Sequence, residues 1–309
     1  MSEPSQPSQK HKIAVIGSGK WGTTIGKIVA QNVKQNSLIF DTIVPIWVYE
    51  EEIDIDSSDI PDKSPVPPTL RSKLGSPPIK LSAAINKIHQ NIKYLPGITL
   101  PENLIANNNL KDTVKGASIL VFSLPDRFLE EVLDEIVGFH RTYARGVWCV
   151  EGKGGDVSDG AVEMIMEKLQ IYCGVLSGAN IAGEVARERF CEMSIRYDAP
   201  PMDMPDYQEK EGDGGREVSS RKVIINTDEQ RQTNTKPTNL HLTPIPKDYP
   251  PLDTSLIQKH FERPYCKVQN ISDAAGVSIP SAAPWKTYIG YYLRIQIPSS
   301  FKRVKNVCF

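Results

Sequence analysis

Short apolar segments alternate with amphipathic segments from residue 12 to residue 198. The apolar segments are rich in Val and Ile and only a few residues long, which is typical of strands buried on both faces of a sheet. The predicted strands are residues 13–16, 43–49, 118–125, 146–150, 175–180 and 265–271.

Apolar residues recur at helical spacing between these strands. The stretch that follows the first strand places Ile25, Ile28 and Val29 on one stripe, which predicts an amphipathic helix packed against the sheet. This alternation of strand and helix predicts an α/β fold, a doubly wound and mostly parallel sheet covered on both faces. The other predicted helices are residues 82–89, 160–169, 181–186 and 256–261.

Two long polar segments break the alternation. Residues 54–80 are rich in Pro, Ser and Asp, and residues 199–254 contain only one apolar run, 223–225. Such compositions predict flexible or disordered insertions that bury little surface. The chain therefore divides into a polar, disordered tail (1–11), a main domain (12–198), a low-complexity insertion (199–254), the last strand region of the same domain (255–277) and an atypical C-terminal tail (278–309).

Composition restricts the class of protein further. With 309 residues and a formal net charge of −1, the chain does not resemble a general binder of nucleic acid or of acidic membranes. Neither a signal peptide nor an apolar run long enough to cross a bilayer is recognisable. The five cysteines contain no C-x-x-C pair, which predicts reduced thiols in a cytoplasmic protein and no structural metal site.

A glycine motif lies between the first strand and the first helix. Gly17, Gly19 and Gly22 have the spacing G-x-G-x-x-G, in the segment Gly17-Ser-Gly-Lys-Trp-Gly22. The first glycine allows a tight turn, the second lets a pyrophosphate approach the backbone, and the third lets helix and strand pack closely. Because both flanking elements are predicted, the motif indicates dinucleotide binding in a Rossmann-type domain.

An acidic residue that binds the adenosine ribose is expected beyond the second strand. Counting from the glycines selects Asp41, but Asp41 precedes that strand, and cofactors bind beyond carboxyl ends. Tyr49 and Glu50 are better placed. Acidic residues here, without an arginine, favour NAD over NADP, while Glu51 and Glu52 are expected to be solvated charges.

Phe128 follows the strand 118–125, at another carboxyl end where ligands gather in such sheets. Two interpretations stay open. Either the ring lies against the nicotinamide end of a cofactor, or it is an ordinary core aromatic.

The order and content of several segments resemble the NAD-dependent glycerol-3-phosphate dehydrogenase family. The resemblance covers residues 12–198 and then 261–278. The segments that carry it are Gly17-Ser-Gly-Lys-Trp-Gly22, Trp47-Val-Tyr-Glu-Glu51, Lys93-Tyr-Leu-Pro-Gly97, Leu124-Pro-Asp-Arg-Phe128, Gly178-Ala-Asn-Ile-Ala182, Glu184-Val-Ala186 and Phe190-Cys-Glu192.

The resemblance implies hydride exchange between NADH and dihydroxyacetone phosphate, giving sn-glycerol 3-phosphate. It implies that Asn180 faces the reacting centre and that the protein acts on a small molecule. Family members resemble dimers, but much of that contact belongs to the substrate domain that is absent from this sequence, so a homodimer is one possibility and the oligomeric state is open. The residues that it assigns to NAD are Gly17, Ser18, Gly19, Lys20, Trp21, Gly22, Tyr49, Phe128 and Ala182.

The sequence departs from the family in two places. Glu151 stands where the family has a substrate-binding lysine, and Lys153 lies two residues later. The resemblance ends at Ser278, where the family's proton-donating lysine would align with Pro284 and Lys286 lies just beyond. This loss suggests a frameshift, a retained intron or a truncated gene model. A non-catalytic NAD-binding remnant is therefore the alternative to an active dehydrogenase.

Overall fold

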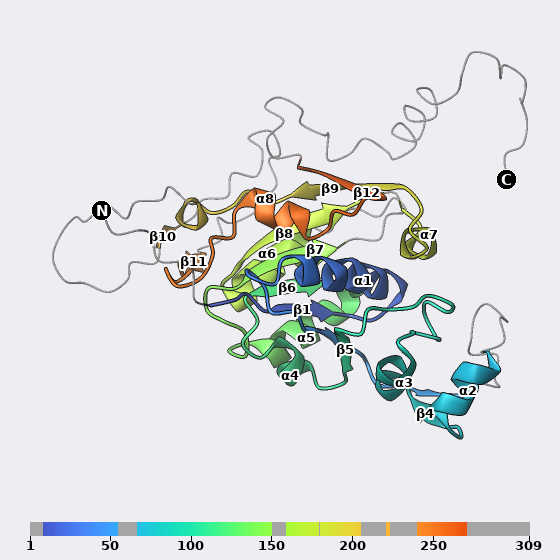
Figure 1. Ribbon diagram of the computed structural model, residues 1–309. Helices are drawn as coiled ribbons and strands as arrows, with labels where there is room; N and C mark the ends of the chain where they lie inside the picture. The colour runs from blue at the N-terminus through green and yellow to red at the C-terminus, as the bar shows by residue number, and fades with distance from the viewer. Residues whose placement is uncertain are drawn as a thin grey trace, which may run out of the picture.

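The computed structural model describes residues 9–54, 67–149, 159–178, 180–204, 221–222 and 240–270. Within them, one large sheet contains the strands β1 (Ile13–Ile16), β2 (Val44–Trp47), β5 (Leu104–Asn107), β6 (Ile119–Phe122), β7 (Arg145–Cys149), β8 (Tyr172–Ser177), β9 (Cys191–Arg196) and β12 (Cys266–Asn270). Their order is β12-β9-β8-β7-β6-β1-β2-β5 (Figure 1). The strands from β8 to β5 are parallel, whereas β9 pairs antiparallel with β8 and parallel with β12.

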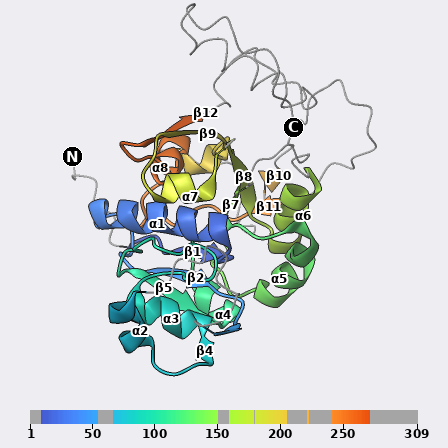
Figure 2. The same ribbon diagram turned by 90° about the vertical axis from the view of Figure 1, so that its right-hand side faces the viewer.

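Helices cover both faces of this sheet, as Figure 2 shows for α1, α7 and α8 on one side and α5 and α6 on the other. No helix among the described residues combines the length and the apolar character needed to cross a membrane. The helices are α1 (Lys20–Gln35), α2 (Pro68–Leu74), α3 (Leu81–Ile88), α4 (Leu110–Val114), α5 (Leu129–Ile136), α6 (Asp159–Leu169), α7 (Ala182–Ala186) and α8 (Thr254–Lys259), with short 3-10 turns η1 (Asp126–Phe128) and η2 (Pro201–Asp203).

The two faces follow from the alternation of side chains along each strand. In β1, Ile13 and Val15 join the core beneath α1, whereas Ala14 and Ile16 join the core beneath α4, α5 and α6. All four are buried, which explains why the strand reads as a continuous apolar run. The predicted α/β fold with a doubly wound, mostly parallel sheet is confirmed.

The expectation that residues 54–80 bury little is wrong for residues 67–80. There α2 is followed by β4 (Ile79–Lys80), which pairs antiparallel with β3 (Glu52–Ile53). Leu74 and Ile79 are buried. Isolated apolar residues between prolines and serines therefore suffice to attach this segment to the core, while residues 55–66 lie outside the described part.

Parts of the second polar segment are also built into the core. Leu240 and Leu242 pack against the face that carries α5 and α6, and Leu252 packs against the opposite face. Leu242 belongs to β11 (His241–Leu242), which pairs with β10 (Arg221–Lys222). The prediction that residues 199–254 form an insertion that buries little surface is therefore wrong at the two ends of this segment. The apolar run 223–225 lies outside the described residues.

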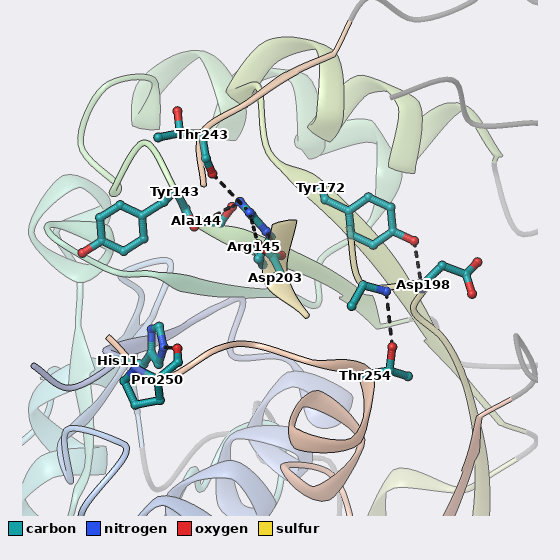
Figure 3. Close-up of polar contacts among 11 residues, drawn as sticks. His11, Tyr143, Ala144, Arg145, Tyr172, Asp198, Asp203, Thr243, Pro250 and Thr254 are labelled. Carbon is teal, nitrogen blue, oxygen red and sulfur yellow. Dashed lines mark hydrogen bonds and ion pairs between the residues drawn. The ribbon is translucent and has the colours of Figure 1, made fainter. Parts of the chain in front are cut away.

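The two ends of this segment meet at the amino edge of the sheet, around Arg145 at the start of β7 (Figure 3). The Arg145 guanidinium donates from Nε and Nη2 to the two carboxylate oxygens of Asp203, both at 2.6 Å. Neither side chain is exposed. Nη2 also donates to the Thr243 carbonyl at 3.2 Å, so one arginine holds both η2 and the segment that precedes α8.

His11 attaches the same segment to the start of the chain. Its Nε2 donates to the Pro250 carbonyl at 2.7 Å (Figure 3). Its Nδ1 lies 2.9 Å from the Ser118 hydroxyl. Because a carbonyl only accepts hydrogen bonds, the proton of the neutral ring is on Nε2. Arg145, Asp203, Thr243, His11 and Pro250 are referred to below as the amino-edge clasp.

Removing one partner of the buried pair should destabilise the fold strongly. We expect Arg145→Met to lower the free energy of unfolding by about 3–5 kcal/mol, because the Asp203 carboxylate is left buried without its partner. The double variant Arg145→Met with Asp203→Leu should recover most of this loss. Urea unfolding measures both. Lys168→Met, which removes an exposed pair with Asp134, is the matched control and should change stability little. An Arg145→Met variant with an unchanged free energy of unfolding would contradict the structural role of this ion pair.

Buried histidines should make the fold sensitive to acid. Burial lowers the pKa of His11, and likewise of His260 in the core, from 6.5 to about 4. Both side chains are therefore neutral in the folded protein at neutral pH. Below pH 6.5 the unfolded chain takes up protons on these histidines and the folded protein does not, so the contribution of the neutral histidines to stability is complete above pH 6.5 and is lost as the pH falls towards 4. At pH 4 we expect each of the two histidines to lower the free energy of unfolding by about 3 kcal/mol, relative to its value above pH 6.5.

Urea midpoints measured between pH 7.5 and 4 test this expectation. His11→Gln should lose part of the pH dependence, while the control His241→Gln, at an exposed position, should retain all of it. A pH profile unchanged by His11→Gln would count against the assignment.

Candidate functional site

The carboxyl ends of β1, β2, β6 and β8 lie at one edge of the sheet, and the turn after β1 is at its centre. Gly17 has φ +109°, a conformation that L side chains rarely adopt. A Cβ at Gly17 would lie 2.1 Å from the Ser123 carbonyl oxygen, and one at Gly22 would lie 2.2 Å from the Gly17 carbonyl oxygen. These two glycines are therefore required by close packing between β1, α1 and the end of β6.

Gly19 differs from both. A Cβ built there meets nothing within 4 Å, and the residue is exposed at the N-terminus of α1. No side chain caps this terminus, and its first turn contains no acidic residue. The N–H groups of a helix N-terminus attract an anion, so the open space at Gly19 and the uncapped helix fit a pyrophosphate.

Buried side chains brace the glycine turn from behind. The Ser18 carbonyl accepts hydrogen bonds from Thr23 Oγ1 at 2.9 Å and Asn91 Nδ2 at 2.8 Å. Asn91 Nδ2 also donates to Thr23 Oγ1, and Asn91 is fully buried. Sequence reasoning missed Asn91, although it lies two residues before the segment Lys93-Tyr-Leu-Pro-Gly97. Its contacts fix the turn before any ligand arrives.

The other predicted residues of the turn differ in exposure. Lys20 is exposed, whereas Trp21 is buried. The indole N–H of Trp21 finds no acceptor among the described residues. A buried donor of this kind is unfavourable unless water or a ligand accepts from it. This orphaned N–H is a second feature of the turn that fits a bound group.

Beyond β2, the acidic residues have structural partners. Glu50 accepts hydrogen bonds from the backbone N–H of Ser82 at 3.1 Å and from its hydroxyl at 2.6 Å. Glu51 pairs with Lys93 and accepts from the Tyr94 hydroxyl. Burial, and then this hydrogen bond to Glu51, raise the pKa of Tyr94 to about 12.

The expectation that Glu51 is a solvated charge is therefore wrong, because it joins the end of β2 to the loop after α3. Glu50 caps the start of α3, which sequence reasoning did not foresee. The expectation holds for the exposed Glu52. Tyr49, 71% exposed, is the side chain that this end of β2 presents to solvent.

Phe128 ends η1, directly after β6, and is 45% exposed. The Arg127 guanidinium lies over its ring, 4.7 Å from the centroid. Of the two interpretations of Phe128, the core aromatic is wrong. The ring lies at the carboxyl edge of the sheet, on the far side of the glycine turn from Tyr49.

Helix α7 lies against α1 and carries Ala182. Thr24 Oγ1 donates to the Ala182 carbonyl at 3.2 Å. Lys27 Nζ donates to the Ala186 carbonyl at 2.8 Å and pairs with Glu188 at 3.0 Å. The pKa of Glu188 is lowered chiefly by the hydrogen bond from Lys27. Lys27 is buried in the middle of an amphipathic helix, so sequence reasoning did not reveal its role.

Asn180 lies between β8 and α7, at the same edge. Its Nδ2 donates to the Glu192 carbonyl at 2.8 Å, which fixes the side chain against the start of β9. The structure thus brings Tyr49, Phe128, Asn180 and α7 to the edge that carries the glycine turn. The remaining predicted residues, Glu151, Lys153 and Lys286, lie outside the described part of the chain.

This arrangement defines the class of protein as an α/β dinucleotide-binding domain of the Rossmann type. Residues 12–202 match the family described as "NAD-dependent glycerol-3-phosphate dehydrogenase N-terminus". The chain belongs to the NAD-dependent glycerol-3-phosphate dehydrogenase family, and NAD is the cofactor of this domain.

Relatives support this assignment. Glycerol-3-phosphate dehydrogenase [NAD(+)] 1 of Schizosaccharomyces pombe is 42% identical over 205 residues, which are 65% of this chain and 48% of that protein. The enzyme of the same name from Saccharomyces cerevisiae is 36% identical over 275 residues, 88% of this chain and 53% of the relative. The chain therefore spans about half the length of the curated relatives that it matches.

Solved structures agree with the fold. Glycerol-3-phosphate dehydrogenase from Saccharomyces cerevisiae superposes with a TM-score of 0.60 at 34% identity, over 88% of this chain and 59% of that one. The enzyme from Plasmodium falciparum superposes with a TM-score of 0.54 at 25% identity, over 85% and 53% of the two chains.

Gly19 and Gly17 should respond differently to substitution. Gly19→Val should leave the unfolding temperature nearly unchanged but weaken NADH binding by roughly tenfold or more, because the new side chain occupies the open space at the helix N-terminus. Gly17→Ala is the matched contrast and should destabilise the fold itself. Protein fluorescence titration with NADH and thermal unfolding separate the two effects. Wild-type NADH affinity in Gly19→Val would overturn the assignment of the turn.

Proposed function

We propose that the protein exchanges hydride between NADH and dihydroxyacetone phosphate, giving sn-glycerol 3-phosphate. The observation that carries the proposal is the glycine turn with open space at Gly19, in a chain that belongs to a dehydrogenase family. A homodimer stays a prediction from the same resemblance, and a cytoplasmic location stays a prediction from the cysteine pattern.

Backbone N–H groups of residues 17–22 would hold the pyrophosphate of NAD, with Lys20 as a nearby cation and Trp21 offering its indole N–H. Tyr49 would lie beside the adenosine end, and Phe128 and Ala182 beside the nicotinamide end. Their positions at the carboxyl ends of β2 and β6 and on α7 support this order, because ligands bind at this edge in doubly wound sheets.

Bound NADH supplies the hydride. Asn180 would face the reacting centre in an orientation set by its hydrogen bond to the Glu192 carbonyl. We propose Lys286 as the donor of the proton to the carbonyl oxygen, and Lys153 as the cation that offsets the phosphate charge. Glu151, at the position of the family lysine, would repel that phosphate.

Turnover and binding measured on the same preparation test the proposal. The purified full chain should oxidise NADH when dihydroxyacetone phosphate is added, and absorbance at the NADH band measures the rate. Lys286→Met should lower kcat roughly a hundredfold or more with NADH affinity unchanged, and Lys153→Met should mainly raise KM. Lys168→Met, which removes an ion pair between α6 and α5 away from the glycine turn, is the control.

The outcomes separate the two readings of the sequence. NADH binding without turnover would support the non-catalytic remnant and reject the proposed reaction. Absence of NADH binding would reject both readings together.

A further inference from the structure

Two cysteines lie opposite one another on the last two strands of the large sheet. Cys191 begins β9 and Cys266 begins β12, and the parallel register pairs them directly. Figures 1 and 2 show these strands side by side. Adjacent strands lie about 4.8 Å apart, and disulfides join Cα atoms roughly 4.4–6.8 Å apart. Both are free thiols in the structure. The backbone therefore places the two residues at a separation that a disulfide can span.

The side chains also meet. The Cys266 thiol donates a hydrogen bond to the Cys191 sulfur, which lowers the pKa of Cys191 and raises the pKa of Cys266. Cys191 is thus the better nucleophile of the two, because the thiolate is the reactive form. Cys266 is placed to attack the Cys191 sulfur once that sulfur has been oxidised.

The other described cysteines are arranged differently. Cys173 pairs in register with Gly146, and Cys149 pairs with Leu176, so these two thiols are not opposite one another. Burial raises the pKa of both, which makes them poor nucleophiles. They serve as internal controls of the same residue type.

We propose that Cys191 and Cys266 are a redox modification site that closes to a disulfide when the oxidant is hydrogen peroxide. The Cys191 thiolate attacks the peroxide, an S–O bond forms, the O–O bond breaks, and the departing hydroxide takes up a proton as water. Cys266 then attacks the Cys191 sulfur, the S–S bond forms, the S–O bond breaks, and hydroxide leaves with the Cys266 proton as a second water. The two thiols lose two electrons and the peroxide gains them.

The place of the pair in the sheet explains both access and consequence. Cys191 is 4% exposed and Cys266 is fully buried, but among the described strands β12 lies at the edge of the sheet and pairs only with β9. Local opening of such an edge exposes both thiols to a small oxidant. Glu192, which follows Cys191, accepts the hydrogen bond from Asn180. A disulfide would therefore fasten the edge strand directly beside the residue that orients Asn180.

Mass spectrometry of the full chain tests the proposal. Reduced protein is treated with hydrogen peroxide, unreacted thiols are alkylated after denaturation, and the mass and the digest are compared with untreated protein. We expect a loss of about 2 Da before alkylation, a peptide pair joined through Cys191 and Cys266, and reversal by dithiothreitol. The oxidised protein should also unfold at a higher temperature than the reduced protein.

Variants separate this site from the other cysteines. Cys173→Ala should still form the cross-link. Cys266→Ser should not, and peroxide should leave a sulfenic acid at Cys191 that dimedone captures. The proposal is overturned if Cys191 and Cys266 are both alkylated as free thiols after peroxide, or if the cross-linked peptide contains Cys308 in place of either. It is also overturned if dimedone does not label Cys191 in Cys266→Ser.

Discussion

The close approach of the first turn to the end of β6 is the constraint on which the rest of the site depends. Gly17 takes a left-handed conformation with no room for a Cβ against the Ser123 carbonyl, and Gly22 packs on the Gly17 carbonyl in the same way. Together they bring the N-terminus of α1 to the middle of the sheet, next to the carboxyl ends of the parallel strands. Because Asn91 and Thr23 satisfy the Ser18 carbonyl from inside, the outward N–H groups stay available for an anion.

The two edges of the sheet perform different tasks. At the carboxyl edge the side chains are partly exposed, as Tyr49 and Phe128 are, and their backbone is held from behind by Glu51, Lys27 and Thr24. At the amino edge, the clasp of Arg145 and Asp203 is fully buried. A buried ion pair is a costly way to gain stability, but it fixes one arrangement, because a misplaced segment would leave a charge without a partner. The clasp thereby positions α8 and β12 on the far side of a long connection.

Sequence reasoning recovered the central elements because their signals are local. The strands β1, β2, β6 and β7 are short apolar runs, and the helices α1, α3, α6 and α8 have apolar stripes. The predicted boundaries differ from the observed ones where the apolar pattern was weak. The strand predicted at 175–180 is β8, which begins at Tyr172 and ends at Ser177. The strand β9 escaped notice because polar residues alternate along it, which is expected where one face is partly solvated. The strand β5 escaped notice because its apolar run is only three residues long before Asn107.

The sequence by itself determined the dinucleotide-binding turn, the α/β class and the family, because glycine spacing and strand–helix alternation depend only on residues that are close together in the chain. Only the tertiary structure decided that Glu50 and Glu51 are structural, that Asn91 and Lys27 support the site, and that residues 199–204 and 240–254 contribute side chains to the core. The physical reason is distance along the chain. Arg145 and Asp203, or Cys191 and Cys266, meet across dozens of residues, and no local pattern of polar and apolar positions specifies which buried charge or thiol will face which.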